Sequence, residues 1–279
     1  MSEQEVTYPE GAIKVLDKGF VRLVEAMGDD SSIVQSARVS YGKGTKTVNE
    51  DRGLIRYLMR HQHTTPFEMV EFKFHCRMPI FVARQWIRHR TANVNEMSAR
   101  YSEMPEWFYD PSPELCTTQS AQNRQGGTGD QVADSEESSQ YFKDTHKKTY
   151  EIYEGFLQKG MRRELARAIL PISLYTEWYW KIDLHNLLHF LKLRMDPHAQ
   201  YEIRVFAEAM AEIVKERVPF AWEAFEDYVI HGIKLTRLEI EYIKNMLSGS
   251  PLPLETVISN KREQEELKEK LQKVGLNIN

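Results

Sequence analysis

The segment from Val70 to Met78 alternates strictly between apolar and polar side chains. Apolar residues occupy one face (Val70, Phe72, Phe74, Cys76 and Met78) and polar residues the other (Glu71, Lys73, His75 and Arg77). Side chains of a β-strand point alternately to the two faces of a sheet, so this pattern predicts a strand with one face in the core. Pro79 ends the strand and suits the first turn of a helix, which we expect over 80–88.

Apolar periodicity predicts the other elements. We expect a short strand and a helix ending at Gly28, a second long strand over 171–180, and helices over 30–37, 51–61, 141–157, 162–170, 183–194, 197–217, 219–228, 236–247 and 261–274. Residues 111–139 offer little to bury, so we interpret them as a long polar loop. Their Gly126-Gly-Thr-Gly129 run has no preceding strand, which favours flexibility over a phosphate loop.

The character of the chain changes past Gly232. Thr236 and Glu239 are spaced as a capping box for the helix that follows them. The last helix is highly charged, and its apolar residues Leu267, Leu271 and Val274 align on one side. This pattern is typical of a surface arm or of a helix that packs on a partner, and its charge favours the solvated arm.

Composition limits the class of partner. The 279 residues include 41 acidic and 37 basic ones, a formal net charge of -4, whereas a general nucleic-acid binder needs a strongly basic face. The cysteines, Cys76 and Cys116, show no metal-ligand spacing and indicate a reducing compartment. The polar N-terminus and the short apolar runs predict neither a signal peptide nor a membrane span. We therefore expect a cytoplasmic protein that binds neither nucleic acid nor membrane.

A dense polar stretch covers the end of the predicted helix at 80–88 and continues beyond it. Residues 84–102 hold four arginines with a histidine, an amide, a carboxylate and a serine, namely Arg84, Arg88, Arg90, Arg100, His89, Asn95, Glu96 and Ser98. Arginines four apart on a helix are usually surface charges, but three consecutive basic residues at 88–90 cannot all leave by one face. Guanidinium groups bind phosphate bidentately where water is partly excluded. The stretch therefore predicts an anion pocket.

A second polar set lies on a leucine-rich helix. Asp183 can cap this helix, and His185, His189 and Arg194 lie around it. A single histidine on an apolar helix is usually a satisfied core residue. Two histidines together with an arginine favour the second wall of a pocket.

Metal and nucleophilic chemistry find little support in the sequence. The pair His61-Gln-His63 is too short a signal for a metal site, so we expect none. Ser98 lacks the GxSxG turn of a serine nucleophile, and Cys76 falls on the apolar face of its strand. Cys116 lies in the polar loop, and the sequence places no base beside any of the three.

Several separate motifs resemble one family. They are Ala37-Arg-Val-Ser40, His63-Thr-Thr-Pro-Phe-Glu68, Gln85-Trp-Ile-Arg-His-Arg90, Asn95-Glu-Met-Ser-Ala-Arg-Tyr-Ser102, Arg167-Ala-Ile-Leu-Pro171 and Leu193-Arg-Met-Asp-Pro-His-Ala-Gln200. Within them, Arg88-His-Arg90 followed after seven residues by Ser98 resembles the RHR-x7-S signature of the flavin-dependent thymidylate synthases. The similarity covers about residues 12–232, and it is specific because the motifs occur in the family's order.

The resemblance implies a fold and a reaction. It implies an α+β subunit with an antiparallel sheet flanked by helices, in a catalytic domain over 1–232 with a polar insertion at about 111–139. Residues 233–279 would form a helical C-terminal extension. The implied reaction is reductive methylation of dUMP to dTMP, with 5,10-methylenetetrahydrofolate as carbon donor, NADPH as reductant and FAD as carrier. The resemblance also implies a homotetramer with active sites at subunit interfaces, and no cysteine nucleophile.

The resemblance further implies roles for single residues. Cofactor binding falls to Thr65, Arg88, His89, Arg90, Thr91, Glu96, Asp183, His185 and His189, where Asp183 and His185 replace an Asn and an Arg often found in the family. Substrate binding falls to Gln85, Arg88, Glu96, Met97, Ser98, Ala99, Arg100, Arg167 and Arg194. Arg194 would be the catalytic residue that holds the uracil ring, and Arg100 and Arg167 would pair with the 5'-phosphate. His63 and Ser40 are expected on the flavin or folate side.

A binding module is the alternative from another class. In a nucleotide or single-stranded RNA binding module, Arg84-Gln-Trp-Ile-Arg-His-Arg90 would be a basic patch with an aromatic ring for stacking. The acidic net charge and the confinement of basic residues to pocket-like segments favour the enzyme.

Overall fold

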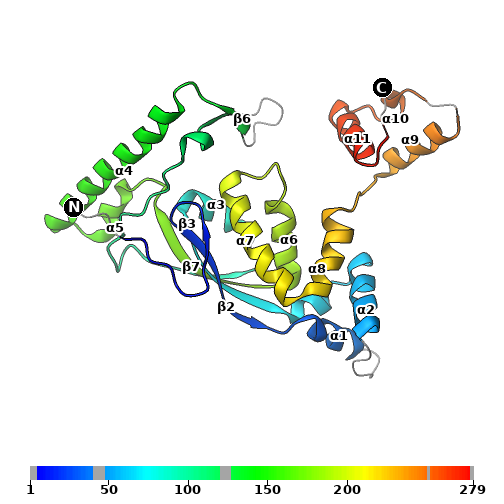
Figure 1. The fold of residues 1–279 in the computed structure, drawn as a ribbon, viewed down its shortest axis with the longest axis horizontal. Coiled ribbons are helices and arrows are strands. Elements are labelled where there is room, and N and C mark those ends of the chain that lie inside the picture. The colour runs from blue at the N-terminus through cyan, green and yellow to red at the C-terminus, as the bar shows by residue number, and fades with distance from the viewer. Residues whose placement is uncertain (1–4, 40–47, 120–126, 250–251, 277–279) are drawn as a thin grey trace. The chain divides into compact units, whose positions relative to one another are not determined.

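The computed structural model of the chain describes residues 5–39, 48–119, 127–249 and 252–276. The chain divides into two compact units, Met1–Phe225 and Glu226–Asn279. This division lies a few residues before the boundary expected at Gly232, and whether the second unit is a domain of its own stays a prediction. Figure 1 shows the elements of each unit.

A five-stranded antiparallel sheet forms the centre of the first unit, in the order β1-β2-β3-β7-β4. The strands are β1 (Ile13–Val15), β2 (Gly19–Met27), β3 (Glu71–Pro79), β4 (Asn93–Glu96) and β7 (Tyr175–Asp183). The alternation read over 70–78 is confirmed, because Phe72, Phe74 and Cys76 are fully buried. β3 pairs with β7 along its length, with Phe74 opposite Trp180. The two long strands expected from the sequence are therefore neighbours.

The helices of the first unit are α1 (Asp30–Val39), α2 (Val48–Arg60), α3 (Ile80–Trp86), α4 (Ser135–Gln158), α5 (Arg163–Ala166), α6 (Leu184–Arg194), α7 (Tyr201–Arg217) and α8 (Pro219–Phe225), with 3-10 turns η1 (Thr65–Met69), η2 (Pro113–Leu115) and η3 (Arg167–Ile169). Of these, α3, α6 and α7 pack against the sheet (Figure 1). Trp86 of α3 packs against Trp178 and Trp180 of β7 and Phe190 of α6. The α+β class with an antiparallel sheet and flanking helices is confirmed.

The helix expected to end at Gly28 is wrong, because this segment is strand β2. β2 pairs with β1 on one side and β3 on the other, so the sheet satisfies its backbone groups, and this pairing outweighs the local helical spacing. Phe20 and Val21 are buried in the sheet. The tight turn into β2 requires Gly19, since a Cβ there would lie 2.7 Å from the carbonyl oxygen of Val15.

The expected polar loop over 111–139 holds regular structure at both ends. Strands β5 (Thr117–Gln119) and β6 (Gly127–Gln131) pair as a separate two-stranded sheet, and α4 already begins at Ser135. The hydroxyl of Ser139 donates to the carbonyl oxygen of Pro111 at 2.7 Å, which ties the start of the segment to α4. Gly126 of the glycine-rich run lies outside the described residues.

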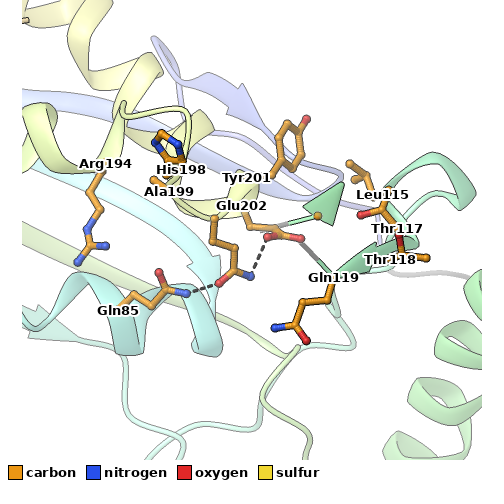
Figure 2. Close-up of a pocket in the computed structure, with 12 residues that line it drawn as sticks. Gln85, Leu115, Thr117, Thr118, Gln119, Arg194, His198, Ala199, Tyr201 and Glu202 are labelled. Carbon is orange, nitrogen blue, oxygen red and sulfur yellow. Dashed lines mark hydrogen bonds between the residues drawn. The ribbon is translucent and has the colours of Figure 1, made fainter. Parts of the chain in front are cut away.

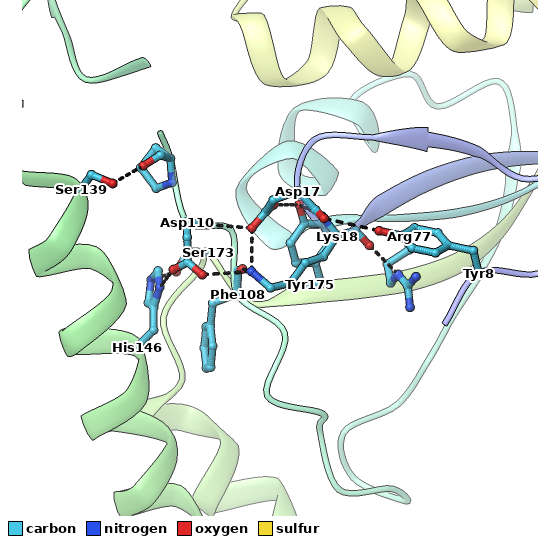
Figure 3. Close-up of polar contacts among 11 residues, drawn as sticks. Tyr8, Asp17, Lys18, Arg77, Phe108, Asp110, Ser139, His146, Ser173 and Tyr175 are labelled. Atoms are coloured by element: carbon cyan, nitrogen blue, oxygen red, sulfur yellow. Dashed lines mark hydrogen bonds and ion pairs between the residues drawn. The ribbon is translucent and has the colours of Figure 1, made fainter. Parts of the chain in front are cut away.

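A polar network joins four distant parts of the first unit (Figure 3). Lys18 Nζ donates to Asp17 Oδ2 at 2.6 Å and to Asp110 Oδ2 at 2.9 Å. The other oxygen of Asp110 bonds His146 Nδ1 at 2.7 Å, and His146 Nε2 bonds the Ser173 hydroxyl at 2.6 Å. This order is that of a hydrolase triad, but Ser173 is only 8% exposed and Lys18 shares the aspartate. We therefore assign the network a structural role.

The second unit is helical. After a π-helical turn (Glu226–Ile230) it contains α9 (Arg237–Leu247), α10 (Leu254–Val257) and α11 (Lys261–Lys273). The expected capping box of Thr236 and Glu239 is confirmed, with both hydrogen bonds present. The expectation that the last helix is a solvated arm is wrong, because Leu267 and Leu271 of α11 are buried in a cluster within this same unit. In the described parts of the chain, no helix combines the length and the apolar character needed to cross a membrane.

Candidate functional site

The polar stretch 84–102 starts on α3 and continues into β4. Trp86 is fully buried among the aromatic residues of β7 and α6, so it anchors the end of α3 in the core. The chain then makes one further turn, in which the amides of Arg88 and His89 donate to the carbonyl oxygens of Gln85 and Trp86 at 3.4 and 3.0 Å. This anchored turn holds polar side chains at the edge of the hydrophobic core.

Arg194 and His89 form the closest contact between the two polar sets that the sequence singled out. Arg194 lies in the last turn of α6 and donates from Nε to Nε2 of His89 at 3.1 Å. The accepting nitrogen must carry no proton, and burial together with the charges of Arg194 and His189 lowers the pKa of His89 to about 4. Among the described residues Arg194 makes no other hydrogen bond, so its terminal nitrogens remain available to a ligand.

This contact predicts a measurable titration. We expect the Arg194→Met variant to raise the pKa of His89 from about 4 toward the ordinary value of 6.5, because a neighbouring positive charge is removed while burial remains. Side-chain NMR of the histidines against pH measures the shift. Arg237→Met, a change in the second unit, serves as control and should leave the pKa of His89 where it is. An unchanged pKa in Arg194→Met would contradict the coupling.

A cavity of about 590 Å³ opens beside Arg194, and we call it the α6–α7 cavity (Figure 2). It is lined by Gln85 of α3, by Arg194, by residues 198–202 at the start of α7, and by parts of β5 and β6. Gln85 Nε2 donates to Gln200 Oε1, and Gln200 Nε2 donates to Glu202 Oε2 at 2.8 Å. The wall of the cavity therefore combines a cation with a chain of hydrogen bonds.

A smaller cavity of about 210 Å³, which we call the β4 cavity, opens beside His89. Its lining includes His89 and Arg90 together with Val94 of β4 and the rings of Trp178 and Trp180. The indole N–H of Trp178 is buried and has no hydrogen-bond partner among the described residues. This cavity presents aromatic walls and a cation.

The segment 96–100 carries the remaining predicted substrate residues of the polar stretch. Glu96 Oε1 accepts a hydrogen bond from the Thr176 hydroxyl at 2.6 Å, so β7 fixes its carboxylate. Ala99 is buried in the same cluster as Ala166 of α5, which brings the chain at Arg100 close to the start of η3. Met97 and Arg100 are exposed, and Ser98 is half-buried.

Five of the predicted arginines have no acidic partner. They are Arg88, Arg90, Arg100, Arg167 and Arg194, and none makes an ion pair with any residue that the structure describes. Some other arginines of the chain are paired, for example Arg52 and Arg56 with Glu223 at 2.6 Å. Lack of an ion pair is not confined to the predicted site, because Arg22 and Arg84, among others, have none with the described residues either. In a chain with more acidic than basic residues, unpaired cations gathered on the predicted site residues indicate anionic ligands.

The other predicted cofactor residues lie around the start of α6 and on neighbouring loops. Thr65 is the exposed first residue of η1, which packs against α6. Asp183 is confirmed as the helix cap, with Oδ1 accepting from the Asn186 amide at 2.9 Å. His185 is half-buried, whereas Thr91 and His189 are exposed. His63 stacks on the ring of Tyr57, and Ser40 lies outside the described residues.

Neither cysteine nor serine offers an activated nucleophile in the described chain. Cys76 is fully buried, and burial raises the pKa of its thiol well above the ordinary value, which keeps it protonated. Cys116 is a free, half-buried thiol. The Ser98 hydroxyl oxygen accepts from the backbone amide of Arg100 at 3.3 Å, a contact within its own turn. The site therefore offers binding groups rather than a nucleophile.

The sequence alone did not assign roles to Gln200, Glu202 and Tyr109, although all three connect to Gln85. Tyr109 donates to Glu202 Oε1 at 3.2 Å and so extends the chain of hydrogen bonds that starts at Gln85. Gln200 lies at the end of the motif over 193–200, which was the only available signal. Side chains from residues 85, 109 and 202 meet only after folding.

Comparison with known proteins gives consistent matches. A family model described as "Thymidylate synthase complementing protein" matches residues 22–220. A protein of Thermus thermophilus named flavin-dependent thymidylate synthase is 58% identical over 236 residues, covering 85% of this chain and 86% of its own length. Proteins of the same name from Rickettsia conorii and Dictyostelium discoideum are 52% and 56% identical, covering 95% and 92% of this chain and 94% and 86% of their own.

A solved structure is also similar. The UMP/dUMP methylase PolB from Streptomyces cacaoi, bound with 5-Br dUMP, superposes with a TM-score of 0.70 at 34% sequence identity. The match covers 77% of this chain and 98% of that one. A second structure of the same methylase, bound with 5-Br UMP, gives a TM-score of 0.69.

Proposed function

The chain belongs to the flavin-dependent thymidylate synthase family, and we propose that it catalyses the reductive methylation of dUMP to dTMP. The observation that carries this proposal is the group of five arginines without acidic partners at the positions where the family binds its nucleotide and flavin. The likeness to a methylase structure that holds 5-Br dUMP supports a pyrimidine nucleotide as substrate.

We place the base of dUMP in the α6–α7 cavity. The free nitrogens of Arg194 would donate to the uracil ring, where a fixed cation stabilises negative charge and makes C5 more nucleophilic. Gln85 lines the same cavity and would contact the nucleotide beside Arg194. Because His89 is neutral and accepts from Nε, it orients the guanidinium without competing for the ligand.

The 5'-phosphate would be bound by exposed, unpaired arginines. Arg100 and Arg167 fit this role, because their chain segments are held together by the packing of Ala99 against the cluster that includes Ala166. Two guanidinium groups can bind one phosphate through parallel hydrogen bonds. The neighbouring residues Glu96, Met97, Ser98 and Ala99 would contact the nucleotide from the same segment, with Glu96 held by Thr176.

The β4 cavity and the start of α6 fit a flavin dinucleotide. Aromatic walls suit a flat ring, and Arg88 and Arg90, which make no ion pair with the described residues, suit phosphate groups. Thr65, Thr91, His89, Glu96, Asp183, His185 and His189 would complete the contacts to FAD. When bound, FAD supplies the redox chemistry and carries the one-carbon unit, with 5,10-methylenetetrahydrofolate as carbon donor and NADPH as reductant.

A homotetramer with active sites at subunit interfaces fits the distribution of these residues. The phosphate arginine Arg167 follows α5, which packs on α4, whereas Arg194 ends α6, which packs on α7 (Figure 1). A second copy of the chain could complete each site by bringing the two groups together. We propose a cytoplasmic enzyme with a catalytic domain over 1–232 and an extension over 233–279. The RNA-binding alternative is disfavoured by the net charge of -4.

A spectrum tests the flavin. We expect the purified protein to be yellow, with a flavin absorbance band that bleaches when NADPH is added under anaerobic conditions. An Arg88→Ala, Arg90→Ala double variant should take up FAD more weakly, because two phosphate-binding cations are removed. Arg237→Ala, in the second unit, is the matched control and should bind FAD normally. Colourless protein that takes up no added FAD would contradict the proposal.

A further inference from the structure

Three hydrogen bonds connect Gln85 to the inside of the first unit. Gln85 Nε2 donates to Gln200 Oε1, Gln200 Nε2 donates to Glu202 Oε2 at 2.8 Å, and Tyr109 donates to Glu202 Oε1 at 3.2 Å. The dashed lines in Figure 2 follow the first two of these. Gln85, Gln200 and Glu202 are all half-buried, so water competes only partly for their polar atoms.

The carboxylate of Glu202 sets the direction of this chain, because it can only accept hydrogen bonds. Burial and the neighbouring Glu202 raise the pKa of Tyr109, which stays a donor, so one oxygen of Glu202 is already taken. The other oxygen of Glu202 needs a donor, so the Gln200 amide turns its nitrogen toward Glu202 and its oxygen toward Gln85. The Gln200 oxygen can only accept, so the Gln85 amide must turn its nitrogen toward Gln200.

The orientation of Gln85 is therefore determined two residues away from it. A carboxamide has a donor and an acceptor of nearly equal shape and can turn over at little cost when nothing selects one side. Here the Gln85 nitrogen faces Gln200, and Figure 2 shows its oxygen turned away from this contact. The α6–α7 cavity then offers an acceptor from Gln85 together with the donors of Arg194.

We propose that Glu202 is a positioning residue, which acts through Gln200 to present the Gln85 oxygen as a hydrogen-bond acceptor to the nucleotide. The inference rests on the proposed function, which places the nucleotide in the α6–α7 cavity. The group recognised is an N–H or O–H of the nucleotide that lies next to an atom accepting from Arg194. A ligand with only acceptors at this edge would leave the Gln85 oxygen unpaired, which costs binding energy.

Moving the carboxylate from position 202 to position 200 tests whether it determines the orientation of the Gln85 amide. Glu202→Gln replaces the acceptor by an amide that can also donate, so both glutamines can turn over, and KM for dUMP should rise roughly 10-fold while kcat changes little. Adding Gln200→Glu to this variant moves the carboxylate next to Gln85, where it accepts directly from the Gln85 nitrogen. The double variant should therefore recover a KM close to that of the wild type.

Controls separate orientation from general damage. Glu208→Gln makes the same substitution on an exposed side chain of α7, whose carboxylate pairs with Arg204 at 3.6 Å, and should leave KM unchanged. In a Gln85→Ala background, Glu202→Gln should add no further loss, because its route to the nucleotide is gone. If the single variant fails to fold, the double variant alone decides, with a normal KM supporting the proposal and a raised KM overturning it.

The outcomes distinguish this inference from the function on which it rests. Wild-type protein that binds dUMP, combined with no recovery in the double variant or with additive losses in the Gln85→Ala background, would overturn the role of Glu202 alone. Wild-type protein that binds no dUMP in titration calorimetry would overturn the proposed function, and the positioning role with it.

Discussion

Arg194→Ala should retain bound flavin and lose dTMP formation, with kcat falling roughly 100- to 1,000-fold. The side chain ends α6 at the wall of the α6–α7 cavity, and its contact to the described chain is the bond from Nε to His89. Removing it leaves the uracil ring without a fixed cation, so negative charge on the ring is no longer stabilised. Single-turnover formation of dTMP from loaded enzyme measures the effect.

Arg194→Lys is the informative comparison for this variant. Lysine keeps a positive charge but lacks the planar fork, so it should recover only part of the lost rate. The flavin absorbance of both variants reports on folding and on cofactor uptake. Near-normal turnover by Arg194→Ala would show that the cation does not act on the ring, and the placement of the base in this cavity would then be wrong.

Lys18→Met should lower the free energy of unfolding by about 3 kcal/mol, because it leaves the partly buried carboxylates of Asp17 and Asp110 without their cation. Burial opposes the charge on Lys18, but its contacts with the two aspartates outweigh this and raise its pKa. The network also links Asp110 to His146 (Figure 3), so the loss reaches α4. Urea unfolding followed by tryptophan fluorescence measures the change.

Acid unfolding gives a second measure of the same network. Burial raises the pKa of Asp110, but its hydrogen bonds to His146 and Lys18 outweigh this, and the net pKa lies below the ordinary 3.8. A carboxyl whose pKa is lower in the folded state contributes stability above its unfolded pKa and loses it as pH falls through the folded pKa. This acid-dependent contribution, below about pH 4, should shrink in Lys18→Met.

The control is a lysine of strand β3. Lys73 pairs with Glu25 at 3.0 Å, and both side chains are exposed, so Lys73→Met should cost less than about 1 kcal/mol. Equal effects of Lys18→Met and Lys73→Met would contradict a special role of the network.

Local patterns predicted much of the fold. The alternation over 70–78 gave β3, the spacing of Thr236 and Glu239 gave a capped α9, and Asp183 was confirmed as the cap of α6. Each of these depends on residues within a few positions of one another. β2 was missed because its strand state depends on pairing with β3, about fifty positions along the chain.

The candidate site likewise has residues that motifs predicted and contacts that no local pattern predicted. Motif resemblance singled out Arg194 and His89, and the structure joins them by a hydrogen bond. The connection of Gln85 to Glu202 spans more than a hundred positions, and no local spacing signals it. The contact between Asp110 and His146, which are 36 positions apart, has no local signal either. Long-range polar contacts depend on how the elements pack, which periodicity does not encode.

We propose that this chain converts dUMP to dTMP with a flavin. The direct measurement is a product assay with flavin-depleted protein, dUMP, 5,10-methylenetetrahydrofolate, NADPH and FAD, in which each component is omitted in turn. We expect dTMP in the complete mixture and none when any single component is left out. The absence of dTMP from the complete mixture, or its formation without FAD, would contradict this proposal.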